Sequence, residues 1–148
     1  MHRASTPGPQ LEDQLCFAVY AAGHAFNAAY KPLLEPLGLT YPQYLVLMIL
    51  WEGDGLAVGR LGNRLHLDSG TLTPLLKRMD RAGLVTRERD ADDERQVLIR
   101  LTAQGQGLRS RAAGLLAALA CRAGETEPAL AGLRDGLERI TTRLRADS

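Results

Sequence analysis

HLDSGTLTPLLKRMDRAGLVTRERDADDERQVLIRL, residues 66–101, is the stretch of this chain that decides its fold. Its first half repeats apolar residues at spacings of three and four, which predicts an amphipathic helix whose apolar face holds Leu72, Leu75, Leu76 and Met79. Gly83 then ends the helix. Residues 85–89 and 95–101 alternate as strands do, and the polar residues 90–94 between them predict the tip of a hairpin.

The other face of this helix mixes short hydroxyls with long cations, namely Thr71, Thr73, Lys77, Arg78 and Arg81. Such a mixture suits hydrogen bonding to base edges and phosphates in a major groove, although a charged helix face is more often simply solvated. A short helix marked by Val58, Leu61 and Leu65 comes before it. The order of these elements, a short helix, a turn, a basic helix and a hairpin, predicts a winged helix-turn-helix over residues 40–101 with its wing at about 85–101. Double-stranded DNA is then the expected partner.

Two starting points for the basic helix remain open. Asp68 or Ser69 is a favourable N-cap, but that choice places Pro74 beyond the first turn, where it removes a hydrogen bond. Thr71 as the cap places Pro74 at the third helical position, where the missing N–H matters little.

Composition describes an ordinary soluble domain spanning residues 1–148, with 45% hydrophobic and 24% charged residues. The formal net charge is only +1, so DNA affinity depends on where Arg and Lys are placed. Two distant cysteines and three scattered histidines predict no disulfide framework, no metal site and no cofactor. No run is long enough to span a membrane and no signal-peptide core is apparent, which predicts a cytoplasmic, reducing location without a membrane partner.

Apolar stripes continue on both sides of the winged segment. A helix is expected from Leu11, closing at 36–38 with Pro32 kinking or ending it, after a loose tail over 1–10. Residues 44–51 are apolar almost all round and predict a buried helix that opens at Pro42. Thr102 is expected to cap one long helix that Gly124 ends, and a last helix carries Leu130, Leu133, Leu137, Ile140 and Leu144. The fold class is therefore mainly α (α+β).

These terminal helices carry more apolar surface than a small winged domain can cover. The simplest arrangement is a two-fold homodimer in which residues 11–37 and 103–148 form the dimerisation region. Such a dimer presents two basic helices to successive major grooves and predicts a pseudo-palindromic operator. A monomer that packs the same helices internally is the alternative.

Three runs carry a family resemblance: LGLTYPQYLVLMILWE, LHLDSGTLTPLLKRMDRAGLVTR and DDERQVLIRLTAQG. They resemble the MarR family of dimeric winged-helix repressors and, more narrowly, its organic-hydroperoxide sensor branch, OhrR. The similarity runs from about Leu11 to Gly105, whereas the C-terminal third matches only by helix pattern and by Cys121.

The resemblance implies a redox role for the cysteines. Cys16 matches the peroxide-sensing cysteine, Tyr30 and Tyr41 match two tyrosines of the other subunit that hydrogen-bond its sulfur, and Tyr20 matches a further tyrosine beside the site. Cys121 resembles the resolving cysteine of a two-cysteine subgroup, so oxidation of Cys16 to a sulfenic acid would end in an intersubunit disulfide or in a mixed disulfide with a small thiol. Without the resemblance, the residues favour a small buried hydrophobe at Cys16 and ordinary packing roles for Tyr30 and Tyr41.

The DNA contacts are assigned in the same way. Ser69, Thr71 and Thr73 are expected near bases, with Lys77 and Arg78 nearer phosphates. The resemblance implies that an arginine of the hairpin reaches the minor groove, and Arg89 and Arg95 are the candidates on either side of the tip. Asp93 or Glu94 is expected to hold one of these arginines in position.

Three functions fit this sequence. The first is a repressor that is released from DNA when organic hydroperoxides oxidise Cys16. The second is a MarR-type repressor released by a small aromatic ligand, with both cysteines incidental. The third is a thiol peroxidase using Cys16 and Cys121, which the basic helix and wing disfavour, so no catalytic residues are assigned and no enzyme is expected.

Overall fold

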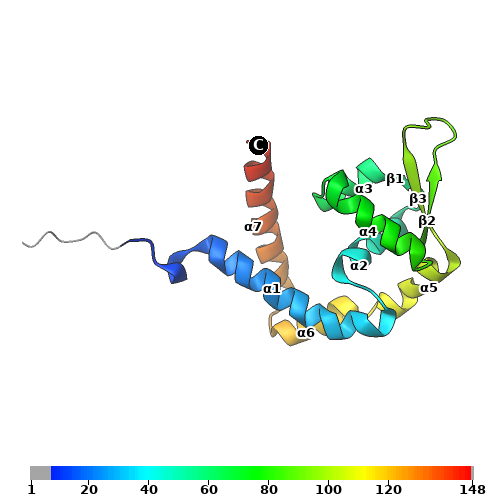
Figure 1. Cartoon of the computed structure of the whole chain (residues 1–148). Coiled ribbons are helices and arrows are strands. Elements are labelled where there is room, and N and C mark those ends of the chain that lie inside the picture. Colours follow the sequence, from blue (N-terminus) through cyan, green and yellow to red (C-terminus); the bar gives the residue numbers. More distant parts are fainter. Residues whose placement is uncertain (1–7, 148) are drawn as a thin grey trace, which may run out of the picture. The chain divides into compact units, whose positions relative to one another are not determined.

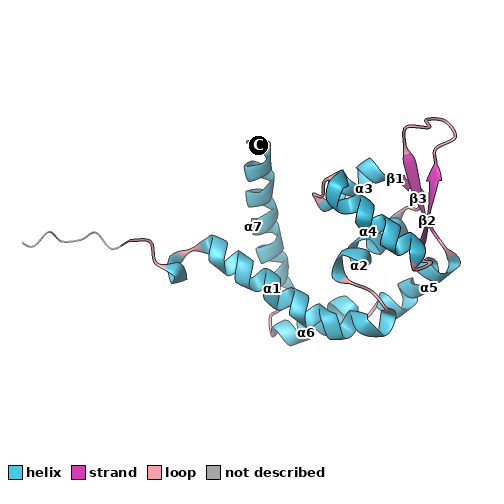
Figure 2. Cartoon of the chain, viewed as in Figure 1, coloured by secondary structure: helices cyan, strands magenta, loops and turns pink. Residues whose placement is uncertain are grey.

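The computed structural model describes residues 8–147, so most of the expected tail over 1–10 lies outside the described part of the chain. The fold is mainly helical with one small sheet, which confirms the predicted fold class (Figures 1 and 2). In chain order the elements are η1 (Leu11–Asp13), α1 (Leu15–Leu34), η2 (Glu35–Leu37), α2 (Tyr41–Glu52), β1 (Leu56–Ala57), α3 (Val58–Leu65), α4 (Ser69–Arg81), β2 (Val85–Arg89), β3 (Val97–Leu101), α5 (Ala103–Ala112), α6 (Leu115–Ala123) and α7 (Glu127–Ala146).

Two compact units divide the chain, the first ending at Arg111 and the second starting at Ala112. The first unit contains the winged helix-turn-helix, whose core is formed by side chains that are fully buried, among them Leu47, Leu61, Leu72, Leu76, Met79 and Ile99. These residues come from α2, α3, α4 and β3, so the predicted apolar face of the basic helix does face the core. The second unit contains α6 and α7.

Helix α2 shows how local sequence sets the start of a helix. The Thr40 hydroxyl accepts a hydrogen bond from the backbone N–H of Gln43, and the Gln43 side chain accepts one from the Thr40 N–H. This capping box, with Pro42 in the first turn, fixes where α2 begins. At its far end the Trp51 indole Nε1 donates a 3.0 Å hydrogen bond to the Gly105 carbonyl in α5, tying α2 to the residues that follow the wing.

The basic helix, α4, has Asp68 as its N-cap, which is one of the two starting points that the sequence allows. The Asp68 Oδ1 accepts a 2.8 Å hydrogen bond from the Thr71 N–H, and α4 begins at Ser69. Pro74 therefore lies inside the helix, as the alternative with Asp68 as cap required. Gly83, just beyond the helix, has a φ of +75°, a conformation that disfavours any residue with a Cβ.

The hairpin pairs Val85 with Leu101 and Arg89 with Val97 in antiparallel register. Its second strand begins two residues later than predicted, because residues 93–96 form a turn in which the Gln96 N–H donates to the Asp93 carbonyl at 2.9 Å. A third strand, β1, pairs with β3 and completes the order β1-β3-β2. The sequence did not predict β1, because two residues are too few to show an alternating pattern.

Two predictions about the flanking helices were wrong in detail. The first helix starts at Leu15, after a single 3-10 turn, and not at Leu11. Of the two alternatives for Pro32, the structure excludes that it ends the helix, which continues to Leu34, and the segment closes at Gly38 as expected. The long helix after Thr102 is broken into α5 and α6 around Gly114, a residue with poor helix propensity, and Leu116 faces outward instead of joining the buried face.

Among the described residues, no single helix has the length and apolar composition needed to cross a membrane. The sharply bent pair formed by residues 15–37 and α2 passes that test only when its two parts are taken together.

Candidate functional site

Three tyrosines gather where α1 meets α2. The Tyr30 and Tyr41 rings have centroids 4.8 Å apart, and Tyr44 lies 6.0 Å from Tyr30 and 6.5 Å from Tyr41. Tyr30 is only 7% exposed and Tyr41 is half-buried. The two tyrosines expected to act on one sulfur are therefore neighbours in space, although they lie 11 residues apart in the sequence and on different helices.

Burial keeps these phenols neutral. Desolvation, followed by the proximity of Tyr41 and Tyr44, raises the pKa of Tyr30 to about 12. Burial also raises the pKa of Tyr41 and, together with the nearby Tyr41, that of Tyr44. Because a free cysteine thiol has a pKa near 8.5, the Tyr30 hydroxyl is still protonated at any pH where such a thiol ionises. The cluster can thus offer O–H donors to a thiolate without adding charge.

Cys16 is exposed in the first turn of α1 of the single chain. Tyr20, one turn later, is 64% exposed, and its ring packs edge-on against His24 with centroids 4.6 Å apart. Cys16 and Tyr30 share one helix and are separated by about 20 Å along its axis, at roughly 1.5 Å of rise per residue. The fold thus unites Tyr30 with Tyr41 but leaves Cys16 distant from Tyr30 of the same chain.

Cys121 is a free, exposed thiol near the end of α6. The N-terminal half of α1 around Cys16 is also exposed, and its large apolar side chains include Leu15, Phe17, Val19 and Phe26. Helix α7 carries a second exposed apolar set, Leu133, Leu137, Ile140 and Leu144. Both sets are unusually apolar for surfaces that face water.

The side chains expected to meet DNA lie on α4 and the wing. Ser69, Thr71, Lys77 and Arg78 are exposed, whereas Thr73 is half-buried. Each has therefore the accessibility that a DNA contact requires, with Thr73 the most restricted.

The wing tip is held in shape by its own arginines. Arg95 donates from Nε to the Asp93 carboxylate at 3.0 Å, and this hydrogen bond lowers the pKa of Asp93. Arg89 donates to the backbone carbonyl of Glu94 at 2.7 Å. Asp93 therefore holds Arg95, as expected for one of the two acids, while Glu94 contributes its carbonyl and not its side chain.

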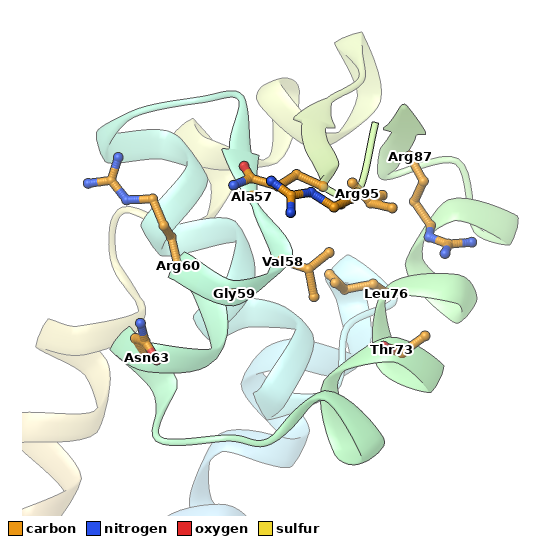
Figure 3. A pocket seen from close by; sticks show the side chains of 11 residues that line it. Ala57, Val58, Gly59, Arg60, Asn63, Thr73, Leu76, Arg87 and Arg95 are labelled. Atoms are coloured by element: carbon orange, nitrogen blue, oxygen red, sulfur yellow. The ribbon is translucent and has the colours of Figure 1, made fainter. Parts of the chain in front are cut away.

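One feature was missed by the sequence reasoning. A pocket of about 510 Å³ lies between the start of α3, the middle of α4 and the wing, and its lining includes Arg60, Thr73, Arg87 and Arg95 (Figure 3). The Arg87 Nε is buried and has no hydrogen-bond partner among the described residues. An unsatisfied buried donor costs roughly 1–3 kcal/mol, more when charged. The strand pattern could have indicated a partly buried arginine, since Arg87 shares the inward side of β2 with the buried Val85.

Within residues 8–147, the His, Cys, Asp and Glu side chains form no group of three or more that could hold a metal ion.

The chain is similar in sequence and in fold to known transcriptional regulators. The family model described as transcriptional regulator SarA/Rot matches residues 28–111. The organic hydroperoxide resistance transcriptional regulator of Bacillus subtilis (strain 168) is 50% identical over 119 residues, which cover 78% of this chain and 81% of that protein. The HTH-type transcriptional regulator TtmR of Methylorubrum extorquens (strain PA1) is 59% identical over 75% of this chain, a match that spans only 57% of the relative.

Among solved structures, AbfR of Staphylococcus epidermidis resembles this chain in several states. Overoxidized AbfR bound to DNA has a TM-score of 0.75 and 36% sequence identity, and the match covers 90% of this chain and 93% of that chain. The disulfide-formed AbfR superposes less well, with a TM-score of 0.64 over 88% of this chain and 92% of that chain.

Proposed function

We propose that this chain, which belongs to the SarA/Rot and MarR type of winged-helix transcriptional regulators, is a homodimeric repressor that senses organic hydroperoxides through Cys16. It is 50% identical to an organic hydroperoxide resistance regulator over 78% of its length. Its relatives are named as DNA-binding transcriptional regulators and not as enzymes. What is proposed beyond that family membership is the signal, its chemistry and the residues that carry it.

The observation that supports this function best is the Tyr30–Tyr41 pair. Its rings lie 4.8 Å apart, and the raised pKa of Tyr30 keeps its hydroxyl a donor. Cys16 of the same chain is too far along α1 to meet Tyr30. A second copy of the chain, packed with its α1 beside this cluster, would supply the sulfur that the pair needs. Tyr20, one turn from Cys16, would then border the same site.

The chemistry follows from a thiolate held by neutral donors. The Cys16 thiolate attacks one oxygen of the hydroperoxide, the O–O bond breaks, and the other oxygen leaves as an alcohol after taking up a proton. The product is a sulfenic acid at Cys16. The thiol of Cys121 of the other subunit then attacks that sulfur, forms an S–S bond and releases water. In the absence of that step, a small thiol from solution would form a mixed disulfide by the same route.

The exposed apolar sets on α1 and α7 support a dimer. We assign residues 11–37 and 103–148 to dimerisation and residues 40–101 to DNA binding. A side chain such as Leu137, 41% exposed, contributes roughly 1 kcal/mol when its exposed part passes from water to an apolar interface, so several of them together stabilise an association.

A two-fold dimer would place two copies of α4 in successive major grooves of a pseudo-palindromic operator. In each half-site, Ser69, Thr71 and Thr73 would face bases, and Lys77 and Arg78 would face phosphates. Arg89 and Arg95 flank the wing tip, where Asp93 holds the Arg95 guanidinium, and one of the two would reach the minor groove. We favour Arg95, since 90% of its side chain is accessible.

Disulfide formation would couple the two halves of the function. A bond between Cys16 and the partner's Cys121 fixes the distance between helices of opposite subunits. The wings belong to the same dimer, so their separation changes and they no longer match the spacing of the operator. Oxidation thereby favours the state that does not bind DNA.

The test is DNA binding before and after oxidation. The reduced protein is titrated onto the DNA upstream of its own gene at fixed salt, then treated with one equivalent of cumene hydroperoxide, alongside Cys16→Ser and Cys121→Ser. We expect the wild type to release DNA, Cys16→Ser to stay bound, and a non-reducing gel to show a covalent dimer that Cys121→Ser lacks.

Other outcomes would point elsewhere. If peroxide leaves wild-type binding unchanged, hydroperoxide sensing is wrong and a repressor released by a small aromatic ligand becomes the better account. Sustained peroxide consumption with a dithiol reductant, without any DNA affinity, would identify a thiol peroxidase instead.

A further inference from the structure

The pocket between α3, α4 and the wing has a strongly cationic lining. Arg60 comes from α3, Arg87 from β2 and Arg95 from the turn before β3, and none of the described residues that line it is acidic. Asp93, from outside the lining, pairs with Arg95 at 3.0 Å. No ion pair is recorded for Arg60 or Arg87 in the described part of the chain, so these two supply the pocket's uncompensated charge.

The start of α3 adds further donors. Ala57, its N-cap, has no side chain that could accept from the first turn, and Ala57, Val58 and Gly59 all line the pocket. The N-terminus of a helix carries a partial positive charge and free N–H groups, which together favour an anion. Gly59 has nothing within 4 Å of the position of a Cβ, so the backbone there is open to approach.

Arg87 is the residue of the pocket lining that has a buried donor without a hydrogen-bond partner among the described residues. This donor is its Nε, whereas the neighbouring Arg89 and Arg95 both have acceptors in the wing. Figure 3 shows Arg87 and Thr73 on one side of the pocket and Arg60 on the other. An oxyanion placed between them would meet a guanidinium, a hydroxyl and a helix N-terminus.

We propose that this pocket binds one backbone phosphate of the operator in each half-site, with Arg87 as the residue that holds it. The proposal rests on the proposed contact of α4 and the wing with DNA. Thr73 of α4 and Arg95 of the wing belong to that surface and also line the pocket, so DNA seated there brings phosphates to its mouth. Its volume, about 510 Å³, accommodates a phosphate together with its sugar.

A phosphate contact has a signature that a base contact lacks. It weakens binding to every sequence alike, and it contributes to the salt dependence of affinity because the charge pair releases counterions. Arg87→Gln should therefore lower affinity for operator and for unrelated DNA by the same factor, about tenfold, and reduce the slope of log K against log salt by about one per subunit. Arg87→Lys keeps the charge and should retain most of the slope.

The matched control is Arg109→Gln, which removes the same charge from an exposed position of α5 outside the pocket. Fluorescence anisotropy of the reduced proteins at several salt concentrations gives both affinity and slope. Circular dichroism of Arg87→Gln establishes that it is folded. Release of its residual DNA by cumene hydroperoxide shows that the sensor works, so loss of the phosphate contact is distinguishable from failure of the redox mechanism.

A scan with single neutral methylphosphonates along the operator then locates the phosphate. At one position in each half-site, the methylphosphonate should weaken binding by the wild type. Arg87→Gln should bind that modified operator as tightly as it binds the unmodified one. The proposal is overturned if Arg87→Gln and Arg109→Gln behave alike, or if no position depends on Arg87. It is also overturned if millimolar inorganic phosphate binds the free protein through Arg87 and competes with DNA while the scan is featureless, because the occupant is then a free anion.

Discussion

The Tyr30 side chain shows how packing changes the pKa of a phenol. In water a phenol and a thiol lose their protons at pH values that are not far apart, near 10 and 8.5. Desolvation at the α1–α2 contact, followed by the proximity of Tyr41 and Tyr44, raises the pKa of Tyr30 to about 12 and widens that gap. The phenol then remains a donor while a thiol beside it becomes an acceptor. Nothing in the spacing of tyrosines along the sequence reveals this, because burial is a property of the packed helices.

Replacing the Tyr30 hydroxyl tests its role toward Cys16. Tyr30→Phe keeps the ring and should remove a hydrogen bond from the Cys16 thiolate, so that alkylation of Cys16 at pH 7 slows by about tenfold, the effect of one hydrogen bond to a charged group. The pH profile of iodoacetamide labelling in the dimer measures this. Tyr44→Phe is the control, since it makes the same change in the same cluster at a tyrosine outside the proposed pair. Identical profiles for both variants would contradict the assignment.

The tyrosine cluster also sets how stability depends on pH. The unfolded chain releases the Tyr30 proton near pH 10 and the folded chain only near pH 12, so the contribution of Tyr30 to stability is constant below pH 10 and is lost as pH rises toward 12. The loss from Tyr30 should reach roughly 2 kcal/mol at pH 12. Urea unfolding between pH 9 and about 12 measures it, and Tyr30→Phe should remove most of the Tyr30 share of the fall. A wild type and variant that fall in parallel would refute this cause.

Among the elements, those with long, regular patterns were predictable. The spacing of Leu72 and its neighbours placed α4, and alternation after Gly83 placed the hairpin, because burial of one face imposes a period on the sequence. Shorter or competing signals failed. Strand β1 has two residues and is recognisable only by its pairing with β3. At Gly114 two signals compete, because the apolar stripe predicts a continuous helix and the glycine favours a break.

Two glycines of α5 should respond to alanine in opposite directions. A Cβ at Gly105 would overlap the carbonyl oxygen of Leu84, which belongs to the link between α4 and β2. Gly105→Ala should therefore destabilise the fold by about 1–3 kcal/mol or more. A Cβ at Gly107 has nothing within 4 Å, so Gly107→Ala should gain up to about 1 kcal/mol from helix propensity. Urea midpoints of the two variants measure the difference, and destabilisation by both would show that α5 tolerates no added methyl.

On the scale of the whole molecule, the sequence predicted the parts of the site but not their assembly. Cys16, Tyr30 and Tyr41 could be chosen only through the family resemblance, and the structure adds that two of them are neighbours while the third is about 20 Å away along its helix. The proposed site, shared between two copies, would leave no periodic signal within one chain. The cationic pocket went unnoticed for a related reason, since its lining comes from three separate segments.

The apolar set on α7 predicts which residues hold the dimer together. Leu137 is 41% exposed in the single chain. Leu137→Glu should weaken the proposed dimer by about tenfold or more, because each subunit loses roughly 1 kcal/mol of leucine burial and brings a charge into an apolar contact. Sedimentation at micromolar concentrations measures the monomer fraction. Glu138→Gln, an exposed change on the neighbouring position, should leave it unaltered, and an equally dimeric Leu137→Glu would exclude α7 from the interface.

The hydrogen bond from Trp51 to Gly105 has an optical consequence. Trp51 is the single tryptophan of the chain. Its indole lies 6.3 Å from the ring of Tyr44 on one side and is bonded to the first turn of the helix that follows the wing on the other. Its intrinsic fluorescence therefore reports on one place only, between the tyrosine cluster and the foot of the wing. Emission wavelength and intensity would follow rearrangement of either neighbour in unlabelled protein and in real time.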